Sequence, residues 1–381
     1  MVPETKGMEI PLNHKLQITN HKLQILFLTP WYPSEKDAMS GLFVLKHVEA
    51  VRAQGVDVRV IFSQGWGDMW RQWRTLRREG WMPDLVQLNV IQKQGLLALW
   101  LKHRYGIPYV IVEHWSGYLP ENGKYMHQPA FKRRFAERVA EQASAILPVS
   151  NTLAKAMQAC GIRNSRWLKI NNVVDDFFFE ISKYRNIEIP NHKPQTTNHK
   201  PKTLLHVSCF DERAKNVKGL LRAAKMLSEK RQDWQLVLVG TGIDYKDVRA
   251  YAESLSFPEG ILRWTGELTP REVAEEMAHA DAFVLSSRYE TYGIILAEAL
   301  AANLPILSTP VGIAEETADL IVPQEIAQYK PGRFAEFIET ILFSAEDCPR
   351  KNEFLPPDTF RSETIGTQLK DIYDSCLHHD I

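Results

Sequence analysis

The chain has 381 residues, of which 44% are hydrophobic and 24% are charged, and its formal net charge is zero. This length is about twice that of a typical domain, so we expect two domains, each with its own core. The four cysteines lie far apart without metal-ligand spacing, which argues against a zinc site or a disulfide framework and fits a reducing cytoplasm. No segment reaches the roughly 20 apolar residues that span a bilayer, and the start has no apolar signal core. We therefore expect a cytoplasmic protein that is neither secreted nor integral to a membrane.

The charge is distributed unevenly between the two halves. Residues 22–175 hold 21 Lys and Arg against 12 Asp and Glu, whereas residues 202–381 hold 19 against 29. A basic first half indicates an anionic partner, and an uneven solvated surface is the equally weighted alternative.

Two polar segments interrupt the apolar pattern. The stretches "NHKLQITNHKLQI" (13–25) and "NHKPQTTNHKPK" (191–202) each repeat an Asn-His-Lys unit. Two copies of so short a unit do not make a solenoid, and a histidine-rich metal site is the less favoured alternative. We interpret residues 1–21 as a polar tail and residues 181–201 as a linker near the middle of the chain.

Apolar runs alternate with amphipathic stretches on both sides of this linker. The pattern predicts strands at 24–30, 57–63, 85–90, 108–114, 145–150, 203–208, 235–240, 261–266, 282–287 and 305–309, and helices at 44–55, 128–143, 217–230, 269–280 and 293–303. Continuous apolar strands separated by helices are typical of parallel sheets covered on both faces. We expect an α/β fold of two doubly wound domains, residues 22–180 and 202–360, whose ligands bind beyond the carboxyl ends of the strands. Facing each other, two such domains form one cleft.

The stretch "GWGDMWRQWRTLRREGWM" (65–82) combines tryptophan and arginine at helical spacing. An interfacial helix needs rings at headgroup depth and cations for anionic phosphates. A helix packed on the core with a solvated arginine face is the alternative, given at least equal weight. The residues concerned are Trp66, Trp70, Trp73, Arg71, Arg74, Arg77 and Arg78. Together with a second basic cluster at 131–138, they favour a peripheral protein on an anionic membrane surface.

Residues 288–300, "RYETYGIILAEAL", place two glutamates, Glu290 and Glu298, around a predicted helix start. Eight helical steps would separate them by about 12 Å, which is too far for a tight acid and base pair. The free amides at the start of the helix suit a phosphate, and a glycine there allows a close approach. These amides belong to Thr291, Tyr292, Gly293 and Ile294. A surface glutamate and a helix-dipole partner are the alternative from spacing alone.

The segment "ETYGIILAE" resembles the signature of two glutamates separated by seven residues in retaining, nucleotide-sugar-dependent glycosyltransferases of family 4. Further blocks are similar to the family in the same order: "PWYPSEKDAMSGLFVLKHVEAV" to its glycine loop and first helix, "LPVSNTLAKAM" and "INNVVDDFF" to its interdomain approach, and "LVLVGTG" to its second-domain turn. The resemblance implies the GT-B fold, two Rossmann-like domains facing across a cleft. It also implies that a terminal helix, residues 361–381, crosses back to the first domain.

The resemblance implies a role for individual residues of the second domain. Glu298 matches the glutamate that binds the ribose hydroxyls, and Glu290 matches the glutamate placed against the donor sugar. Lys215 matches the lysine that neutralises the diphosphate leaving group, and Gly240 lies in the donor-binding turn. Without this context, an exposed lysine before a helix would be the favoured interpretation.

In the first domain, Gly41 matches the loop glycine that approaches the diphosphate, and His114 matches the active-site histidine that meets the donor sugar. A lone histidine is more often structural, but its place at a strand's carboxyl end favours the functional role.

Some positions depart from the family pattern. The usual arginine after the first strand of the second domain is absent, and Ser208-Cys209 stands there, with Arg213 as the candidate substitute. The usual double glycine is Gly312-Ile313. Both departures leave the donor preference open, and also whether the site is active.

The resemblance implies a hexosyltransferase without cofactor or metal, whose donor is a nucleotide-diphosphate sugar and whose acceptor is a glycan or lipid-linked glycan of a cell-surface polysaccharide. We expect no nucleic-acid partner. An epimerase or hydrolase on the same fold and a catalytically lapsed binding protein are the alternatives. A glycosidase is disfavoured, because its two carboxylates flank the scissile bond across a cleft. The donor base, sugar, acceptor and linkage stay open.

Overall fold

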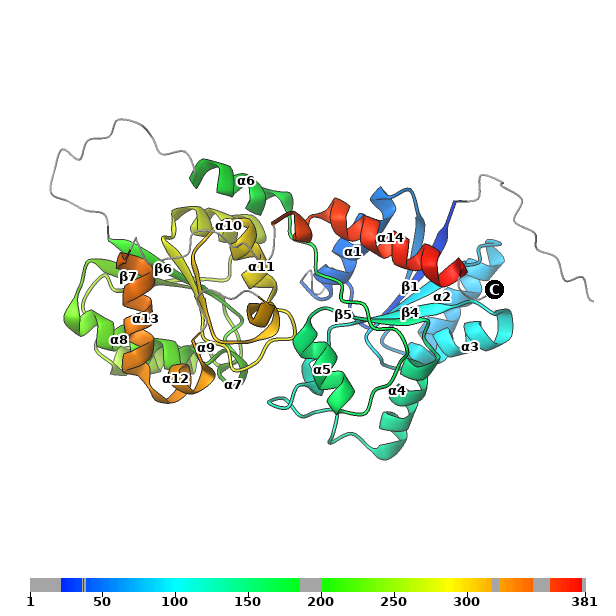
Figure 1. Cartoon of the computed structure of the whole chain (residues 1–381), viewed down its shortest axis with the longest axis horizontal. Coiled ribbons are helices and arrows are strands. Elements are labelled where there is room, and N and C mark those ends of the chain that lie inside the picture. Colours follow the sequence, from blue (N-terminus) through cyan, green and yellow to red (C-terminus); the bar gives the residue numbers. More distant parts are fainter. Residues whose placement is uncertain are drawn as a thin grey trace, which may run out of the picture.

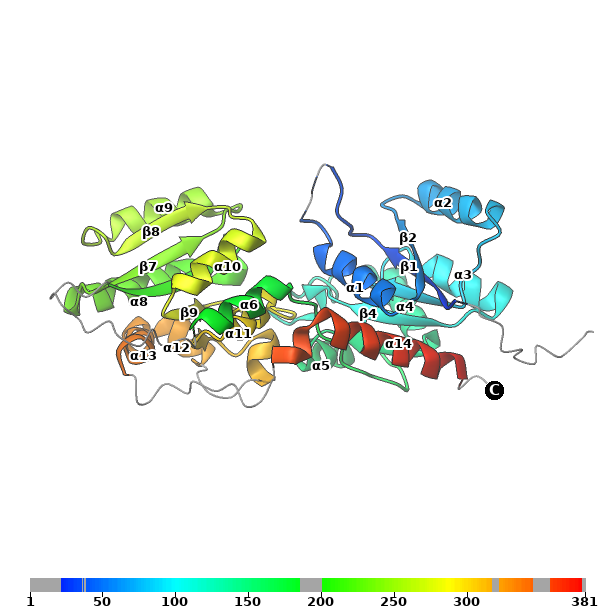
Figure 2. The same cartoon turned by 90° about the horizontal axis from the view of Figure 1, so that it is seen from above.

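The computed structural model describes residues 22–35, 37, 39–185, 201–316, 322–344 and 357–378 (Figure 1). The chain forms two α/β domains that lie next to each other, each with a parallel sheet between layers of helices (Figures 1 and 2). The predicted polar tail at 1–21 and most of the predicted linker, from 186 to 200, lie outside the described residues.

The first domain has five parallel strands in the order β2-β1-β3-β4-β5. They are β1 (Gln24–Thr29), β2 (Asp57–Phe62), β3 (Leu85–Asn89), β4 (Tyr109–Glu113) and β5 (Ala145–Pro148). The helices are α1 (Leu42–Ala53), α2 (Trp66–Arg78), α3 (Gly95–Tyr105), α4 (Ala130–Gln142) and α5 (Asn151–Ala159), with a 3-10 turn, η1 (Ser116–Tyr118). Every residue of the central strands β3 and β4 is buried, whereas the edge strand β2 alternates between buried and more exposed positions. Burial of both faces explains why the central strands are continuous apolar runs.

The second domain repeats this plan with the strand order β10-β9-β6-β7-β8, again with every pair parallel. Its strands are β6 (Lys202–Val207), β7 (Trp234–Val239), β8 (Leu262–Gly266), β9 (Ala282–Leu285) and β10 (Ile306–Ser308). Its helices are α7 (Glu212–Lys215), α8 (Val217–Lys230), α9 (Tyr245–Ser254), α10 (Pro270–His279), α11 (Ile294–Ala301), α12 (Gln324–Tyr329) and α13 (Pro331–Phe343), with the 3-10 turns η2 (Gly312–Glu316) and η3 (Pro357–Phe360). All ten predicted strands and the doubly wound topology are therefore confirmed.

The chain crosses between the domains twice, and the two crossings lie together. The outgoing crossing leads into α6 (Asp176–Arg185), which packs on α10 and α11 of the second domain (Figure 1). Residues up to 180 were predicted to belong to the first domain, but the chain crosses to the second domain before α6 begins at Asp176. On the return, the Val174 amide donates to the carbonyl of Phe360 at 3.0 Å, and Arg361 pairs with Asp176 at 3.3 Å.

The terminal helix α14 (Ser362–His378) packs along α1 of the first domain, as predicted (Figure 1). Gly366 permits this close contact, because a Cβ at that position would lie 2.4 Å from the carbonyl oxygen of Ala50. Farther along the helix, the hydroxyl of Tyr373 donates to the Gln87 side chain inside the first domain. The end of the chain thus joins the second domain to the core of the first.

Candidate functional site

The candidate site lies between the domains, where loops beyond the carboxyl ends of both sheets meet. Arg213 of the second domain donates to the carbonyl oxygens of Glu121 and Asn122 of the first, at 3.3 and 3.1 Å. The Ser150 hydroxyl donates to the carbonyl oxygen of Thr291 at 2.5 Å. A cavity of about 340 Å³ lies between these contacts and is lined by residues of both domains, including Glu290.

Lys215 and Glu290 form an ion pair inside this site. Lys215 Nζ lies 2.5 Å from Glu290 Oε1, and the two side chains are 16% and 13% exposed. The Ser287 hydroxyl donates to the same carboxylate oxygen at 2.8 Å. Two residues 75 positions apart in sequence are thus brought together beyond the carboxyl ends of β6 and β9. The pair presents one cation and one carboxylate to a ligand in the cleft.

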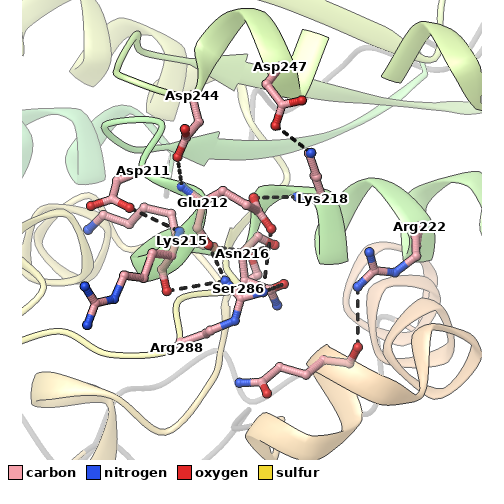
Figure 3. A network of polar contacts seen from close by, with 12 residues as sticks. Asp211, Glu212, Lys215, Asn216, Lys218, Arg222, Asp244, Asp247, Ser286 and Arg288 are labelled. Atoms are coloured by element: carbon pink, nitrogen blue, oxygen red, sulfur yellow. Dashed lines mark hydrogen bonds and ion pairs between the residues drawn. The ribbon is translucent and has the colours of Figure 1, made fainter. Parts of the chain in front are cut away.

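The short helix α7, which ends at Lys215, is held by the loop after β9 (Figure 3). The Ser286 hydroxyl donates to the Lys215 carbonyl at 2.9 Å, and Arg288 donates to Asn216 Oδ1 at 2.9 Å. Asn216 ends the helix in the left-handed conformation, with a φ of 51°. These contacts hold the backbone of Lys215 in place and so fix the position from which its side chain extends into the site.

Lys215 stays charged in this environment. Burial disfavours the ammonium form, but the ion pair with Glu290, together with the electrostatic effects of Cys209 and Asp211, outweighs that cost and raises the pKa of Lys215. Its neighbour His206 is buried, and desolvation lowers the pKa of His206 to about 4. Lys215 is therefore a cation beside a neutral imidazole at neutral pH.

The loop from Thr291 to Ile294 leads from this pair into α11. Gly293 adopts a φ of 78°, which glycine tolerates and other residues rarely adopt. Among the described residues, none accepts a hydrogen bond from the amides of Thr291, Tyr292, Gly293 or Ile294. Unpaired amides at a helix N-terminus are a ready site for an anion.

The altered glycine pair, Gly312-Ile313, supports this loop. Gly312 has a φ of 54°, and a Cβ there would lie 2.3 Å from the carbonyl oxygen of Tyr292. The Ile313 amide donates to that same oxygen at 2.9 Å. The first glycine is therefore needed for packing, while Ile313 is buried and contributes its backbone.

Glu298 lies on α11 and faces the first domain. Burial is the main cause that raises the pKa of Glu298 to about 7, while Lys46 of α1 lowers it and Asp175 raises it. Lys46 itself pairs with Asp175, with a distance of 2.9 Å between Nζ and Oδ2. Glu298 thus lies on the interdomain side of α11, as a ligand that spans the two domains would require. Lys46 and Asp175 were not predicted, since their proximity depends on how the domains dock.

On the first domain, Gly41 and His114 both lie at the start of α1. Gly41 precedes the helix with a φ of 68°, and a Cβ there would lie 2.4 Å from the carbonyl carbon of Trp31. The ring of His114 packs on Phe43 with centroids 4.2 Å apart. Its Nε2 is buried without a hydrogen-bond partner among the described residues. Burial, together with nearby His47, lowers the pKa of His114 well below its usual value, so the ring is neutral.

Glu113, which sequence analysis did not select, holds the loop of His114. Its carboxylate is fully buried and accepts three backbone hydrogen bonds, from Ile91, His114 and Trp115 at 3.0, 2.9 and 2.8 Å. Burial raises the pKa of Glu113 to about 7, although the three amides lower it. The signal in the sequence was a charged residue at the end of an apolar strand.

Arg213 and Gly240 both contribute to the packing around the site, Arg213 through its side chain and Gly240 through its lack of one. The Arg213 guanidinium binds the first-domain carbonyls described above, and no contact joins it to Lys215 in the described part of the chain. Gly240 has a φ of 121°, and a Cβ there would lie 2.0 Å from the Ser208 carbonyl oxygen. Cys209, at the position of the family's arginine, carries a free and exposed thiol.

The helix α2 lies at the end of the first domain remote from the second (Figures 1 and 2). Trp73 is 3% exposed, and Trp70 packs edge-on against Trp100 with ring centroids 5.2 Å apart. These two rings belong to the domain's packing, so the expected face of three exposed tryptophans is wrong; Trp66 alone of the three is exposed. The four arginines, Arg71, Arg74, Arg77 and Arg78, are exposed, with Arg71 paired to Asp68 and Arg77 near the Trp73 ring.

Among the described residues, no cluster of three or more histidine, cysteine or acidic side chains suits a metal ion, and no helix is both long and apolar enough to cross a membrane.

Two facing doubly wound domains with a helix crossing back form the GT-B fold. The family model for Glycosyl transferases group 1 matches residues 188–350, and the model for Glycosyltransferase Family 4 matches residues 14–176. Between them the two models account for most of the chain. The protein belongs to this family of glycosyltransferases.

Named relatives match shorter stretches. Lipopolysaccharide 1,6-galactosyltransferase of Escherichia coli K12 is 30% identical over 129 residues, which cover 33% of this chain and 34% of the relative. N-acetyl-alpha-D-glucosaminyl L-malate synthase of Bacillus anthracis is 28% identical over 190 residues, or 46% of each chain. The chain thus spans a third to a half of these relatives. Among solved structures, Anabaena HepE in complex with UDP and glucose superposes with a TM-score of 0.67 at 18% identity, covering 93% of this chain and all of that one.

Proposed function

We propose that the protein transfers a sugar from a nucleoside-diphosphate donor to a glycan or lipid-linked glycan, with retention of configuration. The observation that carries the proposal is the row formed by the Lys215–Glu290 pair, the unpaired amides of residues 291–294 and Glu298. The row offers a cation, anion-binding amides and an acceptor of hydroxyl hydrogen bonds, in the order of a nucleotide sugar. The similar proteins support it, since HepE was crystallised with UDP and glucose, and the E. coli relative is named a galactosyltransferase.

In the proposed reaction, the bond between the anomeric carbon and the β-phosphate oxygen breaks, and the electron pair leaves with the nucleoside diphosphate. Lys215 and the amides of residues 291–294 stabilise the developing charge. The acceptor hydroxyl bonds to the anomeric carbon on the same face, and its proton goes to the departing phosphate. Glu290 lies against the sugar, and Glu298 accepts from the ribose hydroxyls.

In this proposal, His114 is the first-domain residue that contacts the donor sugar. Its ring is neutral and its Nε2 is unpaired among the described residues, so it has a free hydrogen-bonding position to offer a sugar hydroxyl. The Glu113 carboxylate acts through His114 by fixing its loop. We place the reaction at the cytoplasmic face of a membrane, with the basic first domain toward anionic lipid.

A donor panel tests the proposal. UDP and GDP sugars are screened by thermal shift, and the one that stabilises the protein is incubated with lipid-linked acceptors before mass spectrometry. We expect stabilisation and transfer with the wild type and with Glu253→Gln, an exposed control on α9, and a smaller stabilisation and slower transfer with Glu298→Gln. Free sugar or an epimer formed without acceptor would point to a hydrolase or an epimerase. Tight donor binding without any turnover would point to a binding protein.

A further inference from the structure

An apolar groove crosses the carboxyl edge of the first sheet. It has a volume of about 630 Å³ and is built from the loops after β2, β3 and β4 together with one face of α4. Trp115, which lines the groove, directly follows His114, so the groove and the candidate site share the same loop. This edge of a doubly wound domain is the one at which ligands bind.

Large apolar side chains remain exposed along this groove. Trp66, Leu96 and Phe131 line it and are 48%, 39% and 69% exposed, and the neighbouring Met126 is 54% exposed. Single exposed apolar residues are ordinary, but several that converge on one concave surface indicate a binding site. Trp66 belongs to the segment in which sequence analysis predicted contact with lipid.

The charge of the groove defines what it can bind. Lys93 and Lys132 are the charged residues of its lining, and in the described part of the chain neither ammonium group has an ion-pair partner. None of the described residues contributes a carboxylate to its lining. An apolar channel with two free cations and no acid complements a hydrocarbon chain that ends in a phosphate.

We propose that this groove binds the lipid phosphate of a lipid-linked acceptor. The hydrocarbon chain lies against Trp66, Leu96 and Phe131, and the phosphate meets Lys93 and Lys132, which directs the attached glycan toward His114. The assignment rests on the proposed transferase function for the role of the lipid. A flat bilayer contact would use a convex face, whereas this concave surface suits a single chain.

Calorimetric titration with farnesyl phosphate, below the concentration at which it forms micelles, tests the groove directly. We expect binding by the wild type, at least tenfold weaker binding of geranyl phosphate because five apolar carbons are missing, and weaker binding of farnesol. The double variant Leu96→Gln with Phe131→Gln should lose at least tenfold in affinity, and Lys93→Met with Lys132→Met should remove the preference for the phosphate. Met226→Gln, an exposed apolar residue on α8, is the matched control and should bind as the wild type does.

Several results would overturn the assignment: no binding of farnesyl phosphate, equal binding by the Leu96 and Phe131 double variant at an unchanged melting temperature, or preferential binding of a free oligosaccharide such as maltohexaose. A parallel titration with UDP keeps the two proposals apart. Lipid binding without nucleotide binding would support the proposed lipid site and count against the transferase function. Nucleotide binding without lipid binding would support the transferase function and count against the lipid site.

Discussion

Replacing Lys215 by methionine removes the cation of the proposed leaving-group site and keeps most of the side-chain volume. Two unit charges about 4 Å apart attract by about 4 kcal/mol at an effective dielectric constant of 20. Loss of one preorganised group of this kind lowers kcat by roughly 10² to 10³. The ion pair with Glu290, at 2.5 Å, already holds the Lys215 ammonium in place. The ammonium therefore needs little rearrangement to stabilise the charge of the leaving group. We therefore expect Lys215→Met to lower kcat/KM for the donor by about 10² to 10³.

The same substitution leaves the Glu290 carboxylate with its Ser287 hydrogen bond but without its counterion. Breaking a fully buried pair costs about 3–5 kcal/mol, and this pair retains some exposure, so we expect a loss of about 1–2 kcal/mol in unfolding free energy. Nucleoside diphosphate release measures turnover, and urea unfolding measures stability. Lys230→Met, an exposed lysine at the end of α8, is the control. Turnover within threefold of the wild type by a folded Lys215→Met would refute the assigned role.

Three further variants test other parts of the account. Because the pKa of Glu298 is about 7, nucleotide affinity measured by calorimetry should rise between pH 6 and 8 as the carboxylate ionises, and Glu298→Gln should abolish that rise; an unchanged pH profile would contradict it. Gly312→Ala should destabilise the protein by about 2 kcal/mol more than Gly80→Ala. Both glycines have positive φ, but only a Cβ at Gly312 would collide with the Tyr292 carbonyl. Equal urea midpoints for the two variants would contradict this prediction. The pKa of Glu113 is raised from 4.5 to about 7, so its contribution to stability is present below pH 4.5 and is lost as pH rises through 7; urea unfolding of Glu113→Gln should show a smaller fall over that window, and an identical fall would contradict this.

Much of the fold could be predicted because burial imposes a simple pattern. The inner strands of both sheets are covered on two faces, so they are continuous apolar runs that stand out from the amphipathic helices. The helix α3 was missed for a related reason: its sequence, "GLLALWLKHRY", places apolar residues on nearly every side of its first turns and lacks a helical period. The assignment of residues 176–180 failed because nothing local tells which domain a connecting helix will pack against.

The candidate site was predictable only in part. Its second-domain residues were selected through the family resemblance, and the structure brings Lys215 and Glu290 into contact. Spacing alone could not show this, since the pair depends on the alignment of β6 with β9. The proximity of Lys46 to Glu298 depends on how the two domains dock, which the sequence does not show. Trp73 was wrongly predicted to be exposed, because helical spacing cannot tell an exposed face from a buried one.

Hydrogen–deuterium exchange tests the central claim most directly, because it reports on the backbone amides of the loop that is proposed to hold the phosphates. The peptide covering residues 288–300 is followed by mass spectrometry with and without a saturating amount of the nucleotide sugar chosen by the donor panel. The account predicts strong protection of the amides of residues 291–294 on binding, and much less protection in Lys215→Met. Saturated binding that leaves the exchange of this peptide unchanged would contradict the proposal that the donor lies along the row from Glu290 to Glu298.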